Sequence, residues 1–147
     1  MRITHHDFVT EVLDEWLTEA RMVGFDRQGN TSYRCSDPDA LVVAISAIAP
    51  LPPGRRQRGV FLPKIAERQG EKGLTARERV LKILSEIRNG DPIYPIEVHL
   101  SQNEEFIYEQ HHGVHRLHLS IAVGFSQIAV IEVPKLVNSK NCINANS

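Results

Sequence analysis

Residues 106–133 of this chain read FIYEQHHGVHRLHLSIAVGFSQIAVIEV, and the order of elements in this stretch decides the fold. A strand leads into Gly113, a helical pattern covers Val114–Val123, and Gly124 ends the helix. Ile128–Val133 is then almost continuously apolar, which is typical of an interior strand of a sheet. The stretch therefore predicts a strand, a glycine turn, a helix and a buried strand, in that order.

Two further strand patterns lie upstream. Apolar and polar side chains alternate over residues 95–100, and Glu105–Glu109 follows a turn-like SQNE, so the two segments predict a hairpin. Residues 41–48, LVVAISAI, are apolar and rich in β-branched side chains between Pro38 and Pro50. Their length favours one buried strand over a helix.

The N-terminal segment is predicted to open with a helix. Thr4 and Asp7 form a capping-box pattern, in which Asp7 also suits the positive end of a helix dipole. Apolar residues follow at helical spacing up to Gly24, namely Phe8, Val12, Leu13, Trp16, Leu17 and Ala20. Residues 24–39 are rich in Gly, Asp, Asn and Ser, which indicates a long loop.

A second helix is predicted in the middle of the chain. Thr75 and Glu78 form a capping box, and the helix that they begin ends at Asn89-Gly90. Its apolar face consists of Val80, Ile83, Leu84 and Ile87. A shorter helix over residues 64–69 is expected after Pro63.

Together these elements predict an α+β domain with a small mixed β-sheet flanked by helices and an extra N-terminal helix. Residues 1–39 hold the amphipathic N-terminal helix and a linker, and residues 40–134 hold the domain. The polar residues 135–147 are expected to be disordered. The acidic N-terminal helix either packs on the domain or mediates dimerisation, so the sequence leaves a homodimer open.

The net charge of −1 conceals a basic region at residues 54–90. Ten Lys and Arg stand there against four Glu, an excess that suits either a polyanion such as nucleic acid or a solvated pair of helices. Arg55, Arg56 and Arg58 lie on a loop rich in Pro and Gly, where they either contact phosphates or are simply solvated.

Cysteine use and hydropathy narrow the class of protein. Cys35 and Cys142 are far apart and lack a CxxC context, which fits a reducing cytoplasm better than a secreted disulfide scaffold. No run approaches 18 apolar residues, so no transmembrane helix is predicted. We therefore expect a cytoplasmic protein without a membrane partner.

The glycine turn before the 114–123 helix is the strongest candidate for chemistry. A helix N-terminus offers unpaired N–H groups and partial positive charge, and Gly113 lets an anion approach the backbone. His115 and Arg116 add side-chain donors, and Arg116 can bind a phosphate through two parallel hydrogen bonds. Cations oppose the helix dipole there, so the pattern indicates a phosphate site. The alternative is an exposed His and Arg at an ordinary turn.

Four histidines around this turn raise the question of a metal site, namely His111, His112, His115 and His118. Gly113 interrupts any helix face that they would share, and a packed or hydrogen-bonded His118 is the better account. No structural metal is therefore expected.

The motif Pro95-Ile96-Glu97-Val98, the Gly113-Val114-His115-Arg116 turn and the closing apolar strand resemble the ParB/sulfiredoxin superfamily. Its members share a PIxV strand, a second strand, a G-x-H-R or G-x-R-R turn, a helix ending in Gly and a final strand. The likeness covers about residues 40–134. It implies a bacterial-type domain that binds a nucleotide or phosphate through His112, Gly113, Val114, His115 and Arg116.

Two departures from the family pattern limit what the resemblance implies. Sulfiredoxin has a Cys directly before its His-Arg pair, where this chain has Val114, so sulfinic acid reductase activity is not expected. Many relatives have an acid directly before the motif glycine, where this chain has His112. The superfamily includes CTP-binding partition proteins, nucleases and kinases of free serine, so the fold alone does not name a reaction.

The resemblance leads to a hypothesis of a ParB-like protein that binds ATP or CTP, with Mg²⁺ accompanying the nucleotide, and acts as an NTP hydrolase, phosphotransferase or nuclease. In this hypothesis Arg116 and the helix N-terminus stabilise phosphate charge, His115 orients it, and Glu97 is either the general base or an ordinary exposed strand residue. The alternative is a noncatalytic DNA-binding or regulatory module that uses residues 54–90.

Overall fold

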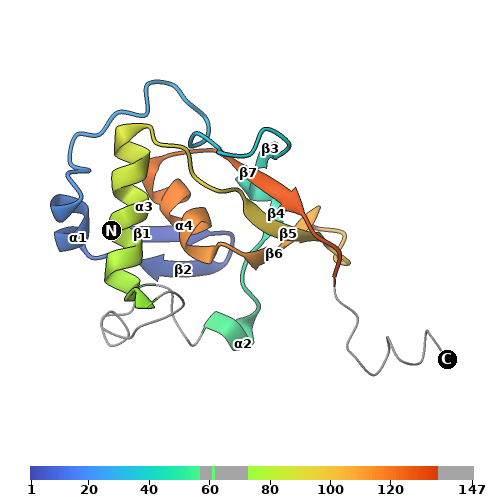
Figure 1. The fold of residues 1–147 in the computed structure, drawn as a ribbon. Coiled ribbons are helices and arrows are strands. Elements are labelled where there is room, and N and C mark those ends of the chain that lie inside the picture. The colour runs from blue at the N-terminus through green and yellow to red at the C-terminus, as the bar shows by residue number, and fades with distance from the viewer. Residues whose placement is uncertain (57–60, 62–72, 136–147) are drawn as a thin grey trace.

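The computed structural model describes residues 1–56, 61 and 73–135 of the chain. Within these residues a five-stranded mixed sheet, four α-helices and a separate two-stranded hairpin form an α+β fold (Figure 1). The order of strands in the sheet is β3 (Leu41–Ala44), β7 (Gln127–Glu132), β5 (Ile96–Leu100), β6 (Tyr108–His112) and β4 (Ile48–Ala49). The predicted α+β class with a small mixed sheet is confirmed. The expected 64–69 helix, Arg58 and residues 136–147 lie outside the described residues.

The centre of the sheet follows the predicted pattern. Strand β7 pairs with β3 in antiparallel fashion and with β5 in parallel fashion, so it is an interior strand. Its residues Ile128, Ala129 and Val130 are at most 1% exposed. Strands β5 and β6 form the expected antiparallel hairpin, although β6 begins at Tyr108, three residues later than predicted.

The prediction of one buried strand over residues 41–48 is wrong. The segment divides into β3, a 3₁₀ turn over Ile45–Ala47 and β4, and the two strands lie at opposite edges of the sheet. Leu41 is 60% exposed and Val42 is 50% exposed because β3 has a neighbour on one side only. The four residues from β3 to β4 span at most about 14 Å. The edges of a flat five-stranded sheet would lie about 19 Å apart, so the sheet has to curl.

The predicted N-terminal helix starting at Thr4 is also wrong. Residues Arg2–His5 (β1) and Phe8–Glu11 (β2) form an antiparallel hairpin, and a helix, α1, covers only Asp14–Glu19. Ile3 and His5 are buried and alternate with exposed neighbours, which is the period of a strand. The backbone of His6 has a φ of 54°, which allows the tight turn between the strands.

Helix α3 (Ala76–Asn89) has the predicted limits and the predicted cap. The Thr75 hydroxyl accepts a hydrogen bond from the Glu78 N–H at 3.1 Å, and the Glu78 side chain accepts one from the Thr75 N–H. Gly90 ends the helix in the left-handed conformation with a φ of 71°. The four apolar residues predicted for its inner face are all buried.

Helix α4 (Val114–Val123) is the centre of the packing. It contacts α3, β5 and the β1–β2 hairpin, and Figure 1 shows it between α3 and the sheet. The predicted core face of Val114, Leu117 and Ile121 is too narrow, since the four consecutive residues Leu117–Ser120 are buried. A helix buried on all sides needs neighbours on all sides. The hairpin, α3 and the sheet supply them.

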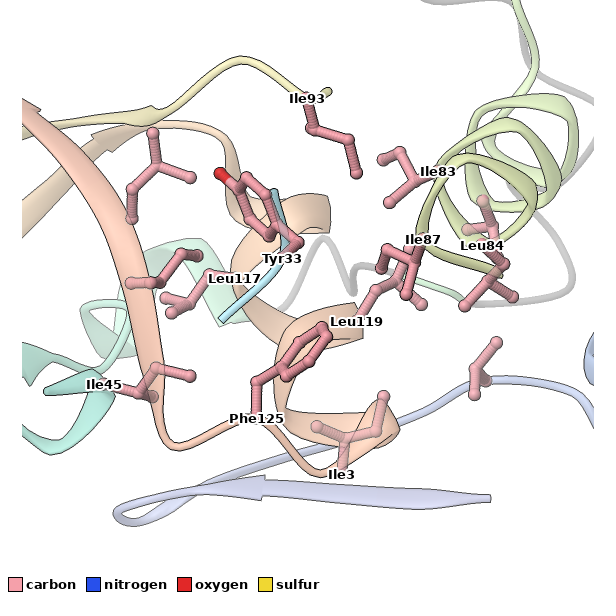
Figure 2. Packing of buried hydrophobic residues seen from close by; sticks show 14 of the residues in the cluster. Ile3, Tyr33, Ile45, Ile83, Leu84, Ile87, Ile93, Leu117, Leu119 and Phe125 are labelled. Atoms are coloured by element: carbon pink, nitrogen blue, oxygen red, sulfur yellow. The ribbon is translucent and has the colours of Figure 1, made fainter. Parts of the chain in front are cut away.

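One hydrophobic cluster joins the N-terminal segment to the rest of the fold. Figure 2 shows Ile3 of the hairpin, Leu84 of α3 and Leu119 of α4 within the same packed cluster. Polar contacts add to it, because Arg77 of α3 forms an ion pair with Glu19 of α1 and Arg88 donates to the carbonyl of Ala20 at 2.8 Å. These contacts hold α1 and the turn that follows it against α3. Among the described helices, none is both long and apolar enough to cross a bilayer.

Candidate anion-binding site

A pocket of about 630 Å³ opens at the first turn of α4. Its walls come from α3, the loop of residues 91–94 that follows α3, the end of β6 and Arg55 of α2 (Pro53–Arg56). The predicted phosphate-binding residues His112–Arg116 all line it. A volume of this size is within the range of pockets for small-molecule ligands and cofactors.

Gly113 shapes the turn that enters α4. Its φ of 105° lies in a region that residues with a side chain rarely adopt. A Cβ at this position would lie 2.6 Å from Cγ2 of Ile96, so no side chain fits against β5. The glycine therefore brings the first turn of α4 close to the sheet and leaves its backbone open toward the pocket.

The N-terminus of α4 has donors that the helix itself does not use. The N–H of Leu117 bonds the carbonyl of Gly113 at 3.0 Å and is the donor of the first turn of the helix. The N–H groups of Val114, His115 and Arg116 precede it, and no side chain caps the helix. Together with the helix dipole, these groups make the turn attractive to an anion.

The side chain of Arg116 folds back over the turn. A Cβ on Gly113 would lie 3.0 Å from Nη2 of Arg116, so the guanidinium lies directly beside the glycine. Its Nε is buried and has no hydrogen-bond partner in the described part of the chain. A buried guanidinium N–H without a partner costs free energy that an anion would recover.

The ring of Tyr33 forms part of the surroundings of Arg116. Its hydroxyl donates to the carbonyl of Tyr94 at 2.8 Å, which ties the loop before β5 to the core. Burial raises the pKa of Tyr33 well above its ordinary value, while the nearby charge of Arg116 lowers it. Tyr33 is therefore a neutral donor at ordinary pH.

His115 is a neutral imidazole in this structure. Burial first, and then the nearby Arg79, His118 and Arg116, lower its pKa to about 4. The ring packs edge-to-face on Phe61, with centroids 5.4 Å apart. Its Nε2 is buried and has no hydrogen-bond partner among the described residues. With Nε2 of His118, which is also buried without a partner among the described residues, the ring nitrogen of His115 and the Nε of Arg116 make three unsatisfied polar atoms in one turn of helix.

Helix α3 contributes cations that sequence reasoning did not place at the site. Arg79 and Lys82 line the pocket, as does Arg55 of α2. With Arg116, the described lining residues therefore include four cationic side chains and two carboxylates, those of Glu86 and Asp91. The sequence places Arg79 and Lys82 on the same helix face as Ile83, which is the signal that could have indicated their role. It becomes meaningful only when α3 is known to pack on α4.

The apolar part of the lining was also missed. Leu74, Ile83, Pro92 and Ile93 form an apolar wall, and Tyr94 lies at the pocket with 71% of its surface exposed. Such a wall suits the flat apolar part of a ligand whose charged end lies at α4.

Several predicted residues lie away from the pocket. Glu97 is on β5 opposite His112 and is not among the lining residues, so the geometry gives no support to its role as a general base. Arg56 also does not line the pocket. His118 is fully buried, donates from Nδ1 to the carbonyl of Val114 at 2.8 Å and packs on Phe8, as expected for a structural histidine.

The described residues contain no group of three His, Cys, Asp or Glu side chains placed to hold a metal ion. Mg²⁺ bound together with a nucleotide needs less, since phosphate oxygens and water supply most of its ligands. Glu86 and Asp91 are the carboxylates among the described lining residues, and Glu86 forms an ion pair with Lys82 at 3.7 Å.

No model of a known protein family matches this chain, and a search of curated proteins finds no relative. The likeness to the ParB/sulfiredoxin superfamily therefore rests on the short motifs of the sequence.

Proposed function

We propose that this protein binds a nucleotide and that the first turn of α4 holds its phosphate. The observation that carries the proposal is the buried Nε of Arg116, which has no partner among the described residues and lies at a helix N-terminus. A cation opposes the dipole at that end of a helix, and a bound anion reverses the balance. The resemblance of Gly113–Arg116 to the superfamily motif points the same way.

The composition of the pocket supports a nucleotide over a bare anion. Arg79 lies close enough to His115 to lower its pKa, so Arg79 and Arg116 both lie at the α4 end of the pocket. The exposed ring of Tyr94 offers aromatic surface on which a base can stack. A concave pocket of about 630 Å³ also suits a mononucleotide better than the outer surface of a DNA duplex.

The basic region of residues 54–90 gives less support to the DNA-binding alternative. Arg77 forms an ion pair with Glu19, and Arg88 donates to the carbonyl of Ala20. These two guanidinium groups hold α1 and the following turn against α3, which leaves fewer basic side chains free to follow a phosphate backbone.

Calorimetry with ATP, CTP and GTP, each with and without Mg²⁺, tests the proposal. At least one nucleotide should bind, and Arg116→Ala should remove a charge-assisted hydrogen bond worth about 1.5–3 kcal/mol. The affinity should then fall about ten- to hundredfold. Arg116→Lys should recover only part of it, because an ammonium group cannot make the paired bonds of a guanidinium.

Arg2→Ala is the matched control, because Arg2 is an exposed arginine on β1 that does not line the pocket. It should leave the affinity unchanged, and Arg116→Ala should leave the unliganded protein folded. Equal affinities in wild type and Arg116→Ala, or no nucleotide binding at all, would overturn the proposal. Binding of a short DNA duplex that weakens steeply with salt and does not depend on Arg116 would favour the DNA-binding alternative.

A further inference from the structure

The imidazole of His115 lies between cations and has one nitrogen with nothing to bond. Arg79 approaches it from α3, while Arg116 and His118 are on its own helix. The ring of Phe61 covers it from another side. Its Nε2 is enclosed, without a hydrogen-bond partner in the described residues, and the residue lines the anion pocket.

The protein groups around His115 keep its ring neutral. Burial withdraws water from the charged form, and two nearby guanidinium groups repel it, so that the pKa of His115 falls to about 4. A neutral imidazole can donate from one nitrogen only. The unpartnered nitrogen is therefore able to take a proton, but burial and the neighbouring cations disfavour the charged ring.

An anion in the pocket changes those electrostatics. A phosphate held by the first turn of α4 would place negative charge next to His115 and offset the charges of Arg79 and Arg116. The protonated ring would then donate to a phosphate oxygen through a charge-assisted hydrogen bond. We propose that His115 takes up a proton when the pocket binds its phosphate, so that binding and protonation are coupled. The inference rests on the function proposed above.

Other groups that face the pocket also titrate or carry charge. They are Arg55 of α2, Lys82 and Glu86 of α3, Asp91 of the following loop, and His111 and His112 of β6. A pH dependence of affinity can therefore have several sources. The contribution of His115 has to be isolated by substitution and by a residue-specific signal.

Imidazole NMR gives the residue-specific signal. The His115 resonance is identified by its absence in His115→Gln, and its titration is followed without ligand, with inorganic sulfate and with ATP. Sulfate keeps two negative charges throughout the range, so its own ionisation does not enter. A nearby opposite charge shifts a pKa by about 1–3 units, so the His115 titration should move up by about two units in the loaded pocket.

Calorimetry gives the thermodynamic consequence. With a bound-state shift of about two units, the affinity for sulfate should rise about tenfold between pH 7.5 and pH 5.0. Titrations at pH 5.0 in two buffers of different ionisation enthalpy should report uptake of about 0.8 proton per bound anion. His115→Gln should remove most of the pH dependence and the proton uptake, and His6→Gln, at an exposed histidine that does not line the pocket, should keep both.

The outcomes separate this inference from the proposed function. Binding of ATP or sulfate with an unchanged His115 titration, or with equal proton uptake in His115→Gln, overturns the coupling and leaves nucleotide binding intact. Failure of both probes to bind at pH 5.0, where the coupling predicts the strongest binding, overturns both. An upward shift of the His115 titration that disappears in Arg116→Ala together with binding supports both.

Discussion

Gly113 shows at the scale of a single residue how the site depends on close packing. Its left-handed backbone and its contact with Ile96 both exclude a side chain. The glycine thereby allows Arg116 to fold over the turn with its Nη2 next to the backbone. Binding of a phosphate at this turn would depend on the same open backbone.

Gly113→Ala should therefore destabilise the fold strongly. The positive φ costs an alanine about 1–2 kcal/mol, and the overlap with Ile96 adds about 1–3 kcal/mol. Gly29→Ala is the matched control, since Gly29 has a φ of +76° with no atom within 4 Å of an added Cβ. It should lose the conformational part only. Urea unfolding at pH 7.5 measures both, and equal losses would show that the contact with Ile96 is easily relieved.

Helix α3 shows how one element serves the core and the site together. Its inner face buries Val80 and Leu84, while Arg79 and Lys82 on the adjoining face line the pocket. The residue at which the helix begins determines which side chains point to the core and which point to the pocket. The capping box at Thr75 therefore matters for the site as well as for the helix.

Replacing this cap should cost a measurable amount. Thr75→Ala should lower the free energy of unfolding by about 0.5–2 kcal/mol, because the Glu78 N–H loses its acceptor. Thr4→Ala is the control, since Thr4 also begins a capping-box sequence but lies exposed on β1, opposite Val9. It should change the stability by less than about 0.5 kcal/mol. A loss at Thr4 as large as at Thr75 would mean that the N-terminal segment is helical after all.

Buried histidines make the stability of the whole molecule depend on pH. Burial first, then the charge of His6, lowers the pKa of His5 to about 4, and burial lowers that of His118 as well. His5 donates from Nε2 to the carbonyl of Ile48 at 2.8 Å, so a histidine of β1 is fastened to β4 at the edge of the sheet. Protonation of these rings would weaken the joint between the hairpin and the sheet.

The stability should therefore fall in mild acid. In the unfolded chain a histidine has a pKa of about 6.5, so the unfolded state binds protons first as the pH falls from 6.5 toward 4. At pH 5.0 this costs about 2 kcal/mol for His5 alone, relative to pH 7.5. His5→Gln, which keeps a donor for Ile48, should reduce the acid loss by about that amount in urea unfolding at the two pH values. His111→Gln, at an exposed histidine, is the control and should leave the acid loss unchanged. An equal acid loss in wild type and His5→Gln would contradict the prediction.

Local sequence signals determined much of this protein. The Thr75–Glu78 cap, the left-handed Gly90 and the alternation over residues 95–100 each act within a few residues, so helix α3 and strand β5 could be predicted. The Gly113–Arg116 turn belongs to the same class. Its glycine, helix start and cationic side chains are neighbours in the chain, so a candidate phosphate site could be proposed before any tertiary contact was known.

Tertiary structure decided the remainder, because the competing local preferences were nearly balanced. Phe8, Val12 and Trp16 reach the core at a spacing of four residues whether the segment is a helix or a hairpin followed by a helix, and packing of Ile3 and His5 beneath α4 selects the hairpin. Residues 41–49 divide into two strands, β3 and β4, because these strands form the two opposite edges of the curled sheet. The position of Arg79 beside His115 depends on α3 packing against α4, a contact between segments about 35 residues apart that no local pattern encodes.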